Sequence, residues 1–487
     1  MQPERKYSLP AIEELLASGG DARIMHNAQG MNKYGCFSVP QPDILSYSSC
    51  TASTISQAGF AAAEQLYRRL EHASHKETAA VTYAREMNRI RKELLALCSL
   101  TNVDIIFGTS GTDLHLFAAQ LLRKENDSLL VIMPDASETG SGVPAALHGR
   151  HFSTCTAFGD KVVQGKAIDD ANGIEVATLK SRLENGALRL ADLVDVEAKA
   201  LAMSAVAEGQ RVLVVLTDIS KTGLTIPSPA CALALKRQFP DMVDVLVDAC
   251  QFRLSNATLR AYLEQDFLLA LTGSKFVTGP AFSAALLVPQ TMARRLRNRT
   301  LPPALNLYSA QADWPLTWSA HSTLPDTANY GLLLRWEAAL AELRAFHALS
   351  KTSIGVFLES FAAAVQKRLE DDPVFEPLVI GEIDRQPIAG RTTWDHIPTI
   401  FPFMLRHSKL GALLNKGEMT KIYERMRIER CYVGQPVACG ALRLCLDMRL
   451  IVDALSSQGR GGDAVIADAM RVLDKAAMLV GQLAATA

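Results

Sequence analysis

Short apolar runs alternate with segments of helical periodicity through the middle of the chain, and this alternation most constrains the fold. The predicted strands are residues 103–107, 128–134, 211–217, 243–248, 267–273 and 283–289, which are short, apolar and bounded by turn residues. The predicted helices are residues 82–98, 113–123, 190–209 and 229–239. This alternation predicts an α/β fold with a mostly parallel sheet covered on both faces. Such sheets bind ligands at the carboxyl ends of their strands.

The pattern changes near residue 290. The sequence there is irregular and rich in Pro and Trp, a long helix is predicted over 331–350, and mixed segments follow. A chain of 487 residues is long enough for two domains of ordinary size. We therefore predict an N-terminal arm that forms part of a small domain (1–80), a large domain (81–290), and a linker with a smaller α+β C-terminal domain (291–487).

Charge and composition narrow the class of partner. The chain has 50 basic and 51 acidic residues, so no charge imbalance indicates nucleic acid or an anionic membrane. The longest apolar runs are too short to span a bilayer, and the start MQPERKYSLP lacks the apolar region of a secretory signal. Nine cysteines without a CxxC pair indicate neither a disulfide framework nor a metal site. We expect a cytoplasmic protein that binds a small molecule.

A single lysine, Lys275, interrupts the apolar stretch LTGSKFVTGP at residues 271–280. Taken alone, a lysine at the end of an apolar segment is usually solvated, with its stem along the surface. Partial burial would instead make it a usable nucleophile toward carbonyl groups. The surrounding segments decide between these two interpretations.

Two other segments place polar groups directly after predicted strands. Asp248 ends the strand 243–248, either as a polar residue that closes the strand or as a carboxylate aimed into a cleft. The turn GTSGT at 108–112 opens a helix, where free N–H groups and the helix dipole favour a phosphate, although many such turns are simple caps. The hydroxyls of Thr272 and Ser274 could bind the same phosphate.

In this order and spacing, the segments resemble fold-type I pyridoxal-phosphate (PLP) enzymes. More narrowly, they are similar to the class V aminotransferase group, which includes cysteine desulfurases, selenocysteine lyase and kynureninase. Residues 84–122 resemble the family's helix, strand and phosphate loop, VLVDACQ at 245–251 its Asp-x-x-Gln motif, and TGSKFVTGP at 272–280 its Schiff-base lysine segment. SKTGLTIPSP at 220–229 resembles its Asn-Glu-Thr-Gly turn, and GALRLCL at 440–446 the segment whose arginine holds the substrate carboxylate.

The resemblance implies a large domain with a mostly parallel seven-stranded sheet, and PLP as the cofactor. Lys275 would form a Schiff base with PLP, Asp248 would pair its pyridine nitrogen, and Gln251 would contact its phenolic oxygen. The other implied cofactor-binding residues are Ser110, Gly111, Thr112, Ser220, Thr272 and Ser274. Arg443 would bind the substrate carboxylate, for which its planar guanidinium is suited, unless it is a surface arginine on an edge strand.

Two positions near the implied cofactor depart from the family pattern. The family usually has a histidine stacked on the cofactor ring, but the equivalent segment, 136–144, offers Glu138 or Thr139 instead. The nearest histidines, at positions 115, 148 and 151, do not align with it, so we expect them to be structural or exposed. Ser274 stands where desulfurases commonly have a histidine.

The chain also lacks a convincing counterpart of the desulfurase catalytic cysteine. Cys431 and Cys439 lie in the corresponding region but are out of register. Cys250 lies inside the cofactor motif, where a buried small residue is the expected role.

The resemblance therefore predicts a PLP-dependent enzyme that acts on an amino acid through a Lys275 Schiff base and a carbanion at Cα. We expect a transaminase or a lyase, because the missing cysteine argues against a desulfurase. An unusual carbon–carbon bond-forming or decarboxylating enzyme of specialised metabolism is an alternative, and a non-catalytic fold-type I homologue is a second. These motifs are common to all of these reactions, so they identify neither the reaction nor the amino-acid substrate.

Homodimerisation with shared active sites is also implied, because fold-type I sites usually lie between two subunits. Residues 20–60 form a long stretch of little periodicity, which usually needs a functional or interface reason to be ordered. Tyr308, Trp314 and Trp318 lie among prolines, and aromatic residues are enriched at interfaces. Alternatively, both stretches cover the core of one subunit.

Overall fold

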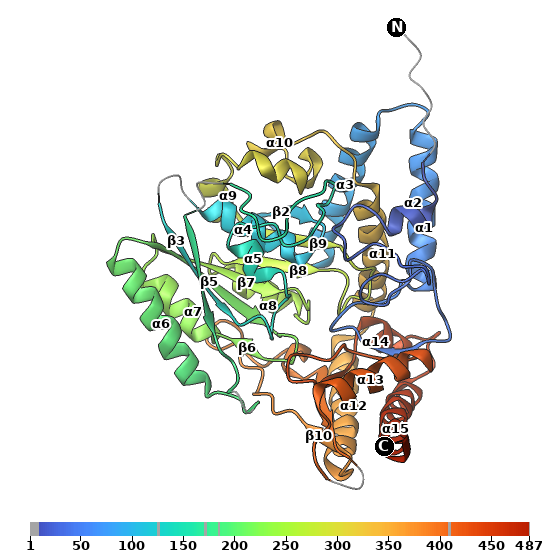
Figure 1. Cartoon of the computed structure of the whole chain (residues 1–487). Helices are drawn as coiled ribbons and strands as arrows, with labels where there is room; N and C mark the ends of the chain where they lie inside the picture. Colours follow the sequence, from blue (N-terminus) through green and yellow to red (C-terminus); the bar gives the residue numbers. More distant parts are fainter. Residues whose placement is uncertain (1–8, 124–126, 170–172, 184–185, 408–410, 487) are drawn as a thin grey trace.

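The computed structural model describes residues 9–123, 127–169, 173–183, 186–407 and 411–486. Its centre is a sheet with strand order β2-β9-β8-β7-β5-β3-β4 and β6 added beside β5 (Figure 1). The strands are β2 (Val103–Gly108), β3 (Leu129–Pro134), β4 (Ile174–Leu179), β5 (Arg211–Asp218), β6 (Thr225–Ile226), β7 (Val243–Ala249), β8 (Leu268–Thr272) and β9 (Ala284–Pro289). The six predicted strands are all present, and the seven-stranded path agrees with the predicted sheet.

The sheet also contains two strands, β4 and β6, that were not predicted from the sequence. Neither has the continuous apolar run that identified the other six strands. β4 lies at the edge of the sheet, so exposed positions interrupt its apolar run. β6 has two residues and pairs antiparallel with β5. On the main path, β9 alone is antiparallel to its neighbours, while β8, β7, β5, β3 and β4 form parallel pairs.

The alternation of side chains along each strand separates two hydrophobic cores. On β5, Val212, Val214 and Leu216 face one core, whereas Leu213 and Val215 face the other. The first face is covered by α3 (Ala79–Leu97), α6 (Ala191–Ala207), α7 (Pro229–Gln238) and α8 (Asn256–Leu263). The opposite face is covered by α4 (Gly111–Leu122), α5 (Val143–Leu147) and α9 (Gln290–Leu296). Because both faces are covered, the central strands consist mostly of apolar residues.

The N-terminal and C-terminal segments meet beside this sheet (Figure 1). Two N-terminal helices, α1 (Ile12–Leu16) and α2 (Gln57–Ala73), pack against α11 (Tyr330–His347). A second sheet has the order β10 (Phe375–Pro377), β11 (Ile400–Leu405) and β13 (Leu442–Cys445). The helices after α11 are α12 (Lys351–Asp371), α13 (Lys416–Ile428), α14 (Met448–Leu455) and α15 (Gly462–Thr486). Finally, β1 (Leu45–Tyr47) pairs in parallel with β12 (Cys431–Val433), so the N-terminal segment joins the C-terminal elements.

The aromatic residues after position 300 do not form an exposed interface. Tyr308, Trp314 and Trp318 are at most 2 % exposed and belong to the core between the large sheet and α4. The indole N–H of Trp318 donates to Asp104 of β2 at 2.7 Å, and that of Trp314 to Ser309 at 2.8 Å. The expectation that these side chains mark a subunit interface is therefore wrong, because they bury their apolar area within one chain.

Within the described ranges, no single helix is both long and apolar enough to cross a membrane. The consecutive helices α11 and α12 reach the required length and hydropathy only as a pair, and they are bent by 95° at their junction.

A buried ion pair fastens the C-terminal segment to the large sheet. Asp218, the last residue of β5, accepts two hydrogen bonds from Arg385 at 2.7 and 2.8 Å and a third from the hydroxyl of Tyr262 at 2.6 Å. Arg385 also donates to the carbonyl of Asp395. Burial opposes the charge on Arg385, but Asp218 outweighs it and holds the pKa of Arg385 above its ordinary value. The pair is bidentate and fully hydrogen-bonded, which a buried charge pair requires.

Replacing Arg385 with methionine is expected to lower the free energy of unfolding by about 3–5 kcal/mol, because it leaves the charge of Asp218 buried without a partner. Denaturant titration followed by circular dichroism measures the loss. The control is Arg391→Met, which removes an exposed pair with Glu382 and should leave stability unchanged within error. Equal stability of the two variants would contradict the fastening role of Arg385.

Candidate active site

The carboxyl ends of three neighbouring strands converge at one edge of the large sheet. Thr217 of β5 lies opposite Asp248 of β7, and Thr272 ends β8. Because these strands are parallel, the segments that follow them leave the sheet on the same side. Two cavities of about 320 and 110 Å³ open there, and they share lining residues that include Arg23, Asp248 and Lys275. The structure thus brings the residues predicted from the sequence into one connected site.

The smaller cavity contains the predicted phosphate-binding groups. It is lined by Ser110, Gly111, Thr112, Thr272 and Ser274. The helix α4 begins at Gly111, so its free backbone N–H groups and the positive end of its dipole lie at the cavity. A Cβ on Gly111 would lie 2.6 Å from the Cys250 sulfur, which explains why this position is glycine. The cavity is therefore suited to a phosphate.

The start of α4 is fixed by a capping box. The backbone N–H of Ser110 donates to the carboxylate of Asp113 at 2.7 Å, and its hydroxyl donates to the same carboxylate at 2.6 Å. Burial is the main reason that the pKa of Asp113 is raised to about 6. This arrangement orders the loop before any ligand binds.

A cation that the sequence analysis did not select also reaches the smaller cavity. The guanidinium of Arg23 donates to the hydroxyls of Ser110 at 3.2 Å and Thr112 at 3.4 Å. Asp21 accepts from Arg23 at 2.9 Å and forms an ion pair with it. Arg23 belongs to the stretch 20–60, which covers the site of its own chain. No periodicity or spacing in the sequence signals a contact between residues almost 90 positions apart.

Asp248 lies against a buried histidine. The His115 Nε2 atom is 3.4 Å from the carboxylate of Asp248, and the backbone N–H of Cys250 donates to that carboxylate at 3.1 Å. Burial opposes ionisation of Asp248, but His115, Lys275 and the side chain of Cys250 outweigh it and hold the pKa of Asp248 well below its usual range. Asp248 therefore stays ionised at physiological pH.

Of the two expected roles, structural or exposed, His115 has the structural one, and it lies at the site. It is 1 % exposed, and its Nδ1 atom lies 2.6 Å from the carbonyl oxygen of Gly111. A carbonyl only accepts, so Nδ1 carries the proton, and Nε2 can donate to Asp248 only when both ring nitrogens are protonated. His115 thus links the start of α4 to Asp248. Its position one turn after Gly111 was the available sequence signal.

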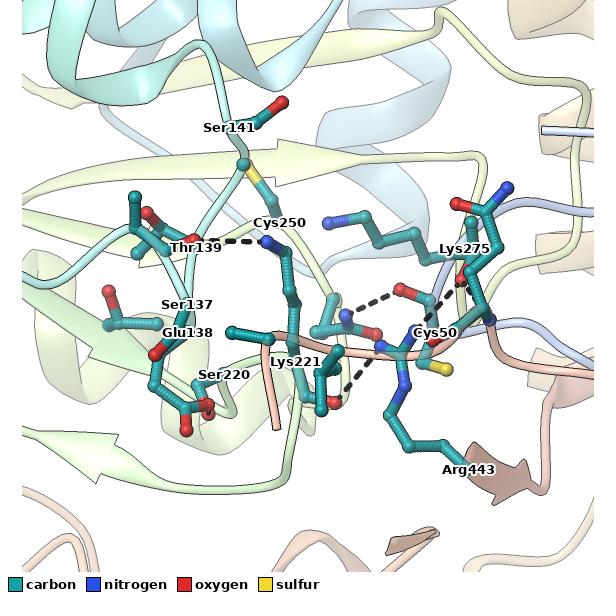
Figure 2. Close-up of a pocket in the computed structure, with 18 of the residues that line it drawn as sticks. Cys50, Ser137, Glu138, Thr139, Ser141, Ser220, Lys221, Cys250, Lys275 and Arg443 are labelled. Carbon is teal, nitrogen blue, oxygen red and sulfur yellow. Dashed lines mark hydrogen bonds between the residues drawn. The ribbon is translucent and has the colours of Figure 1, made fainter. Parts of the chain in front are cut away.

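The larger cavity contains the predicted lysine and arginine. Figure 2 shows Lys221 and Lys275 extending their ammonium groups toward the same part of the cavity, which Arg443 also lines. Gln251 also lines it and donates from its side-chain amide to the carbonyl of Cys50 at 3.0 Å. Lys275 is half-buried, so the interpretation as a fully solvated surface lysine is wrong.

Arg443 is 3 % exposed, and the alternative of a surface arginine is therefore also wrong. Its guanidinium donates to the carbonyl of Lys221 and the hydroxyl of Thr51, both at 3.3 Å or less, and to the carbonyl of Gln435. These neutral acceptors orient the guanidinium at the cavity wall without neutralising its charge.

Of the two candidates for contact with a cofactor ring, Glu138 is already engaged. Its carboxylate accepts from the hydroxyl of Ser220 at 2.6 Å and from the backbone N–H and hydroxyl of Thr222. It therefore holds the turn after β5, and Ser220 serves the same turn. Thr139 lines the larger cavity, and its buried hydroxyl oxygen has no partner among the described residues. Thr139 is the better placed of the two to meet a ligand.

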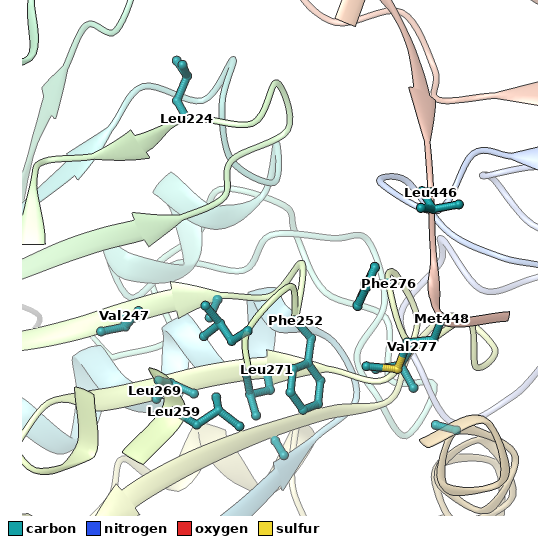
Figure 3. Packing of buried hydrophobic residues seen from close by; sticks show 14 of the residues in the cluster. Leu224, Val247, Phe252, Leu259, Leu269, Leu271, Phe276, Val277, Leu446 and Met448 are labelled. Carbon is teal, nitrogen blue, oxygen red and sulfur yellow. The ribbon is translucent and has the colours of Figure 1, made fainter. Parts of the chain in front are cut away.

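Packing on both sides fixes the segment that carries Lys275. Phe276 and Val277 follow the lysine and lie in the hydrophobic core near Phe252 and Met448 (Figure 3). The carbonyl of Phe276 accepts from the backbone N–H of Met448, the first residue of α14, at 2.9 Å. The segment between β8 and β9 is thus anchored to the C-terminal part of the chain.

Two glycines allow the same segment to lie against α11. A Cβ on Gly273 would lie 2.7 Å from the Cβ of Ala339, and a Cβ on Gly279 would lie 2.6 Å from the same atom. The backbone N–H of Gly279 donates to the carbonyl of Gly273 at 2.8 Å. The glycines of the two Thr-Gly pairs that flank Lys275 are therefore needed for close packing against α11. The hydrogen bond between them closes a tight loop around Lys275.

The cysteines near the site differ from those considered in the sequence analysis. Cys250 is buried behind Gly111, in agreement with its expected role as a small core residue. Neither Cys431 nor Cys439 is among the residues that line the two cavities. Cys50, which the sequence analysis did not select, lines the larger cavity.

No family model matches this sequence, and no curated protein matches it. Solved structures share its fold at low sequence identity. A C-DES mutant with glycine covalently linked to its PLP cofactor is 16% identical, with a TM-score of 0.55 over 88% of this chain and 96% of the other. Tryptophan decarboxylase of Catharanthus roseus in complex with L-tryptophan is 14% identical, with a TM-score of 0.53 over 90% and 83%.

A NifS-like protein of Rickettsia africae is 11% identical to this chain, with a TM-score of 0.51 over 88% and 99% of the two chains. These likenesses extend over both the large sheet and the C-terminal elements. The chain therefore has the α/β architecture of fold-type I PLP enzymes, and the predicted fold class is confirmed.

Proposed function

We propose that this protein is a PLP-dependent enzyme that acts on an amino acid. One observation carries the proposal: Lys275, Asp248 and the start of α4 lie around two connected cavities. A lysine for the aldehyde, a carboxylate for the pyridine nitrogen and an anion site for the phosphate are the three groups that PLP requires. The solved structures of the same fold include one with glycine covalently linked to PLP.

Unpartnered buried atoms at the site support the fit of this cofactor. Among the described residues, the buried side-chain atoms without a hydrogen-bond partner include Thr139 Oγ1, Thr217 Oγ1 and Arg443 Nε, and these three residues line the larger cavity. Buried polar atoms are normally hydrogen-bonded, so these atoms at the cavity wall are suited to a polar ligand. The acceptors and donors of PLP and of an amino acid would satisfy such a site.

Each residue has a distinct role in the proposed enzyme. When bound, PLP withdraws electrons from the Cα atom of an amino acid. Lys275 would hold the cofactor through its aldehyde and would move a proton at Cα. Asp248, held ionised by its surroundings, would keep a proton on the pyridine nitrogen. Arg443 binds the carboxylate of the amino acid, and Gln251 contacts the phenolic oxygen.

We propose a transaminase or lyase as the reaction class, with decarboxylation as the alternative. Both use the same lysine and aspartate, since they differ in which bond at Cα breaks. The alternative is supported by the likeness in fold to a tryptophan decarboxylase. Screening the PLP-loaded protein against the common amino acids and amines, with absorbance and product analysis, tests the proposal. A loaded protein that converts none of them would favour the non-catalytic alternative.

We also propose that the protein is a cytoplasmic homodimer with shared active sites, without nucleic-acid or membrane partners. The near balance of basic and acidic residues supports the absence of nucleic acid and does not oppose self-association. Since Tyr308 and the tryptophans are core residues, the dimer rests on the fold resemblance. Light scattering at micromolar concentration is expected to give twice the chain mass. A monomer with full activity would contradict shared sites.

A further inference from the structure

Three of the cations that line the larger cavity are not exposed and have no carboxylate partner among the described residues, whereas Lys33 and Lys416 on the same wall are exposed. Lys221, Lys275 and Arg443 all line it, and none has an ion pair within 4.0 Å among the described residues. In contrast, Arg23 is paired with Asp21, and Asp248 lies against His115. The one other carboxylate on the cavity wall, that of Glu138, is engaged by Ser220 and Thr222. The larger cavity therefore has excess positive charge for an anionic ligand.

Lys221 is held in a fixed position on the turn between β5 and β6. Its backbone N–H donates to the carbonyl of Glu138 at 2.9 Å, and its carbonyl accepts from Arg443 at 3.2 Å. Its ammonium donates to the carbonyl of Ala136 at 3.1 Å, which leaves two of its three protons free. The hydroxyl of Ser220 donates a hydrogen bond to Glu138, and this bond holds the turn that carries Lys221 in place.

The phosphate of the proposed cofactor does not account for Lys221. The smaller cavity, where the hydroxyls and the start of α4 gather, is not lined by Lys221, whereas Arg443 and Lys221 line the larger one together. In the proposed function Lys275 binds the cofactor and Arg443 binds the α-carboxylate of the amino acid. Among the cations of this cavity that are not exposed and have no carboxylate partner in the described residues, Lys221 is the one to which the proposed function gives no role.

We propose that the substrate is an acidic amino acid whose side-chain anion is bound by Lys221. This inference rests on the proposed function, and it names the substrate class of that site. Because Arg443 bonds to the carbonyl of Lys221 itself, the two cations belong to one rigid cluster. Two carboxylates of a short dicarboxylic amino acid, such as L-aspartate or L-glutamate, match two neighbouring cations with distinct roles.

The surroundings of Lys221 favour an anionic ligand. Burial first, and then Arg443 and Lys275, lower the pKa of Lys221 to about 8, while Glu138 and Asp135 oppose the shift. The ammonium is thus mostly protonated at pH 7, although its charge is unfavourable there without a partner. A bound carboxylate would relieve both the burial and the repulsion.

Calorimetric titration of the PLP-loaded protein tests the inference through binding alone. The probes are L-aspartate against L-asparagine and L-glutamate against L-glutamine, which differ mainly in the side-chain charge. At pH 7 we expect the acidic member of at least one pair to bind about 10-fold to 100-fold more tightly, as a charge-assisted hydrogen bond provides. Lys221→Met should remove this preference, whereas Lys221→Arg should retain it.

The matched control is Lys33→Met, because Lys33 lines the same cavity but is exposed. It should leave the preference unchanged within about 3-fold, since an exposed charge is screened by solvent. Thermal melting checks that Lys221→Met is folded, and Lys221→Gln provides a second neutral variant. Equal binding of both members of each pair, or a preference that survives in both neutral variants, would overturn the inference. Failure of the proposed function is a separate result, namely a protein that binds no PLP.

Discussion

Replacing Lys275 with alanine is expected to abolish covalent attachment of PLP completely. Among the described lysines, Lys275 is the one that lines both cavities. It therefore lies between the proposed phosphate site and the proposed substrate site. The wild-type protein is treated with PLP and borohydride, digested with trypsin and analysed by mass spectrometry. Since a modified lysine blocks cleavage, the label is expected on the peptide that spans residues 261–294.

Lys221 provides the matched control for this experiment, because it is a second lysine in the larger cavity. Lys221→Ala should keep the label on residues 261–294, and Lys275→Ala should lose it without a change in thermal stability. If the label persists in Lys275→Ala, or is lost only in Lys221→Ala, then Lys275 is not the lysine that binds the aldehyde of PLP. The comparison is informative because both ammonium groups point into one cavity (Figure 2).

Replacing Asp248 with asparagine is expected to slow the reaction with an amino acid by about 100-fold or more. Asparagine has nearly the same shape as aspartate but carries no charge. Removing one preorganised electrostatic partner of a reacting group slows enzymes by a factor of this size. PLP should still attach to Lys275, because the phosphate site and the lysine are intact. Stopped-flow absorbance after addition of a reactive amino acid measures the rate.

His115 allows the role of the Asp248 charge to be separated from that of its position. His115→Gln keeps the carboxylate but removes the neighbour that lies 3.4 Å from it, so we expect a smaller loss of rate than in Asp248→Asn. A near-normal rate in Asp248→Asn would remove Asp248 from the mechanism.

The parts of the site that follow buried strands could be predicted from the sequence. Asp248 and Thr272 come directly after apolar runs, and parallel strands bring their carboxyl ends to one edge. Gly111 opens a helix after such a run. Local pattern therefore specified both the sheet and the positions along it where a ligand would bind. Lys275 was selected as a single lysine in an apolar stretch, and its role as a Schiff-base lysine was implied by the family resemblance.

The parts of the site that come from distant segments could not be predicted in this way. Arg23 reaches the start of α4 from a segment without periodicity, and its role depends on a long-range contact with Ser110 and Thr112. Tyr308 shows a second limit, because composition does not distinguish an aromatic residue at an interface from one in a core. Such assignments depend on which surfaces the folded chain leaves uncovered.

The charge of Lys221 shows a third limit of sequence pattern. Its turn was recognised through Ser220 and the glycine at 223, but the sequence does not reveal that Arg443 donates to the carbonyl of Lys221. Only the fold shows that these two cations share a cavity with Lys275. The substrate class proposed above is therefore an inference from tertiary structure.

Titration of the purified protein with PLP, followed by addition of amino acids, tests the central claim most directly. The account predicts equimolar binding, a visible absorbance band that is lost in Lys275→Ala, and a change of that band when a suitable amino acid is added. It further predicts that an acidic amino acid gives this change at the lowest concentration. A protein that binds no PLP, or whose bound cofactor responds to no amino acid, would contradict it.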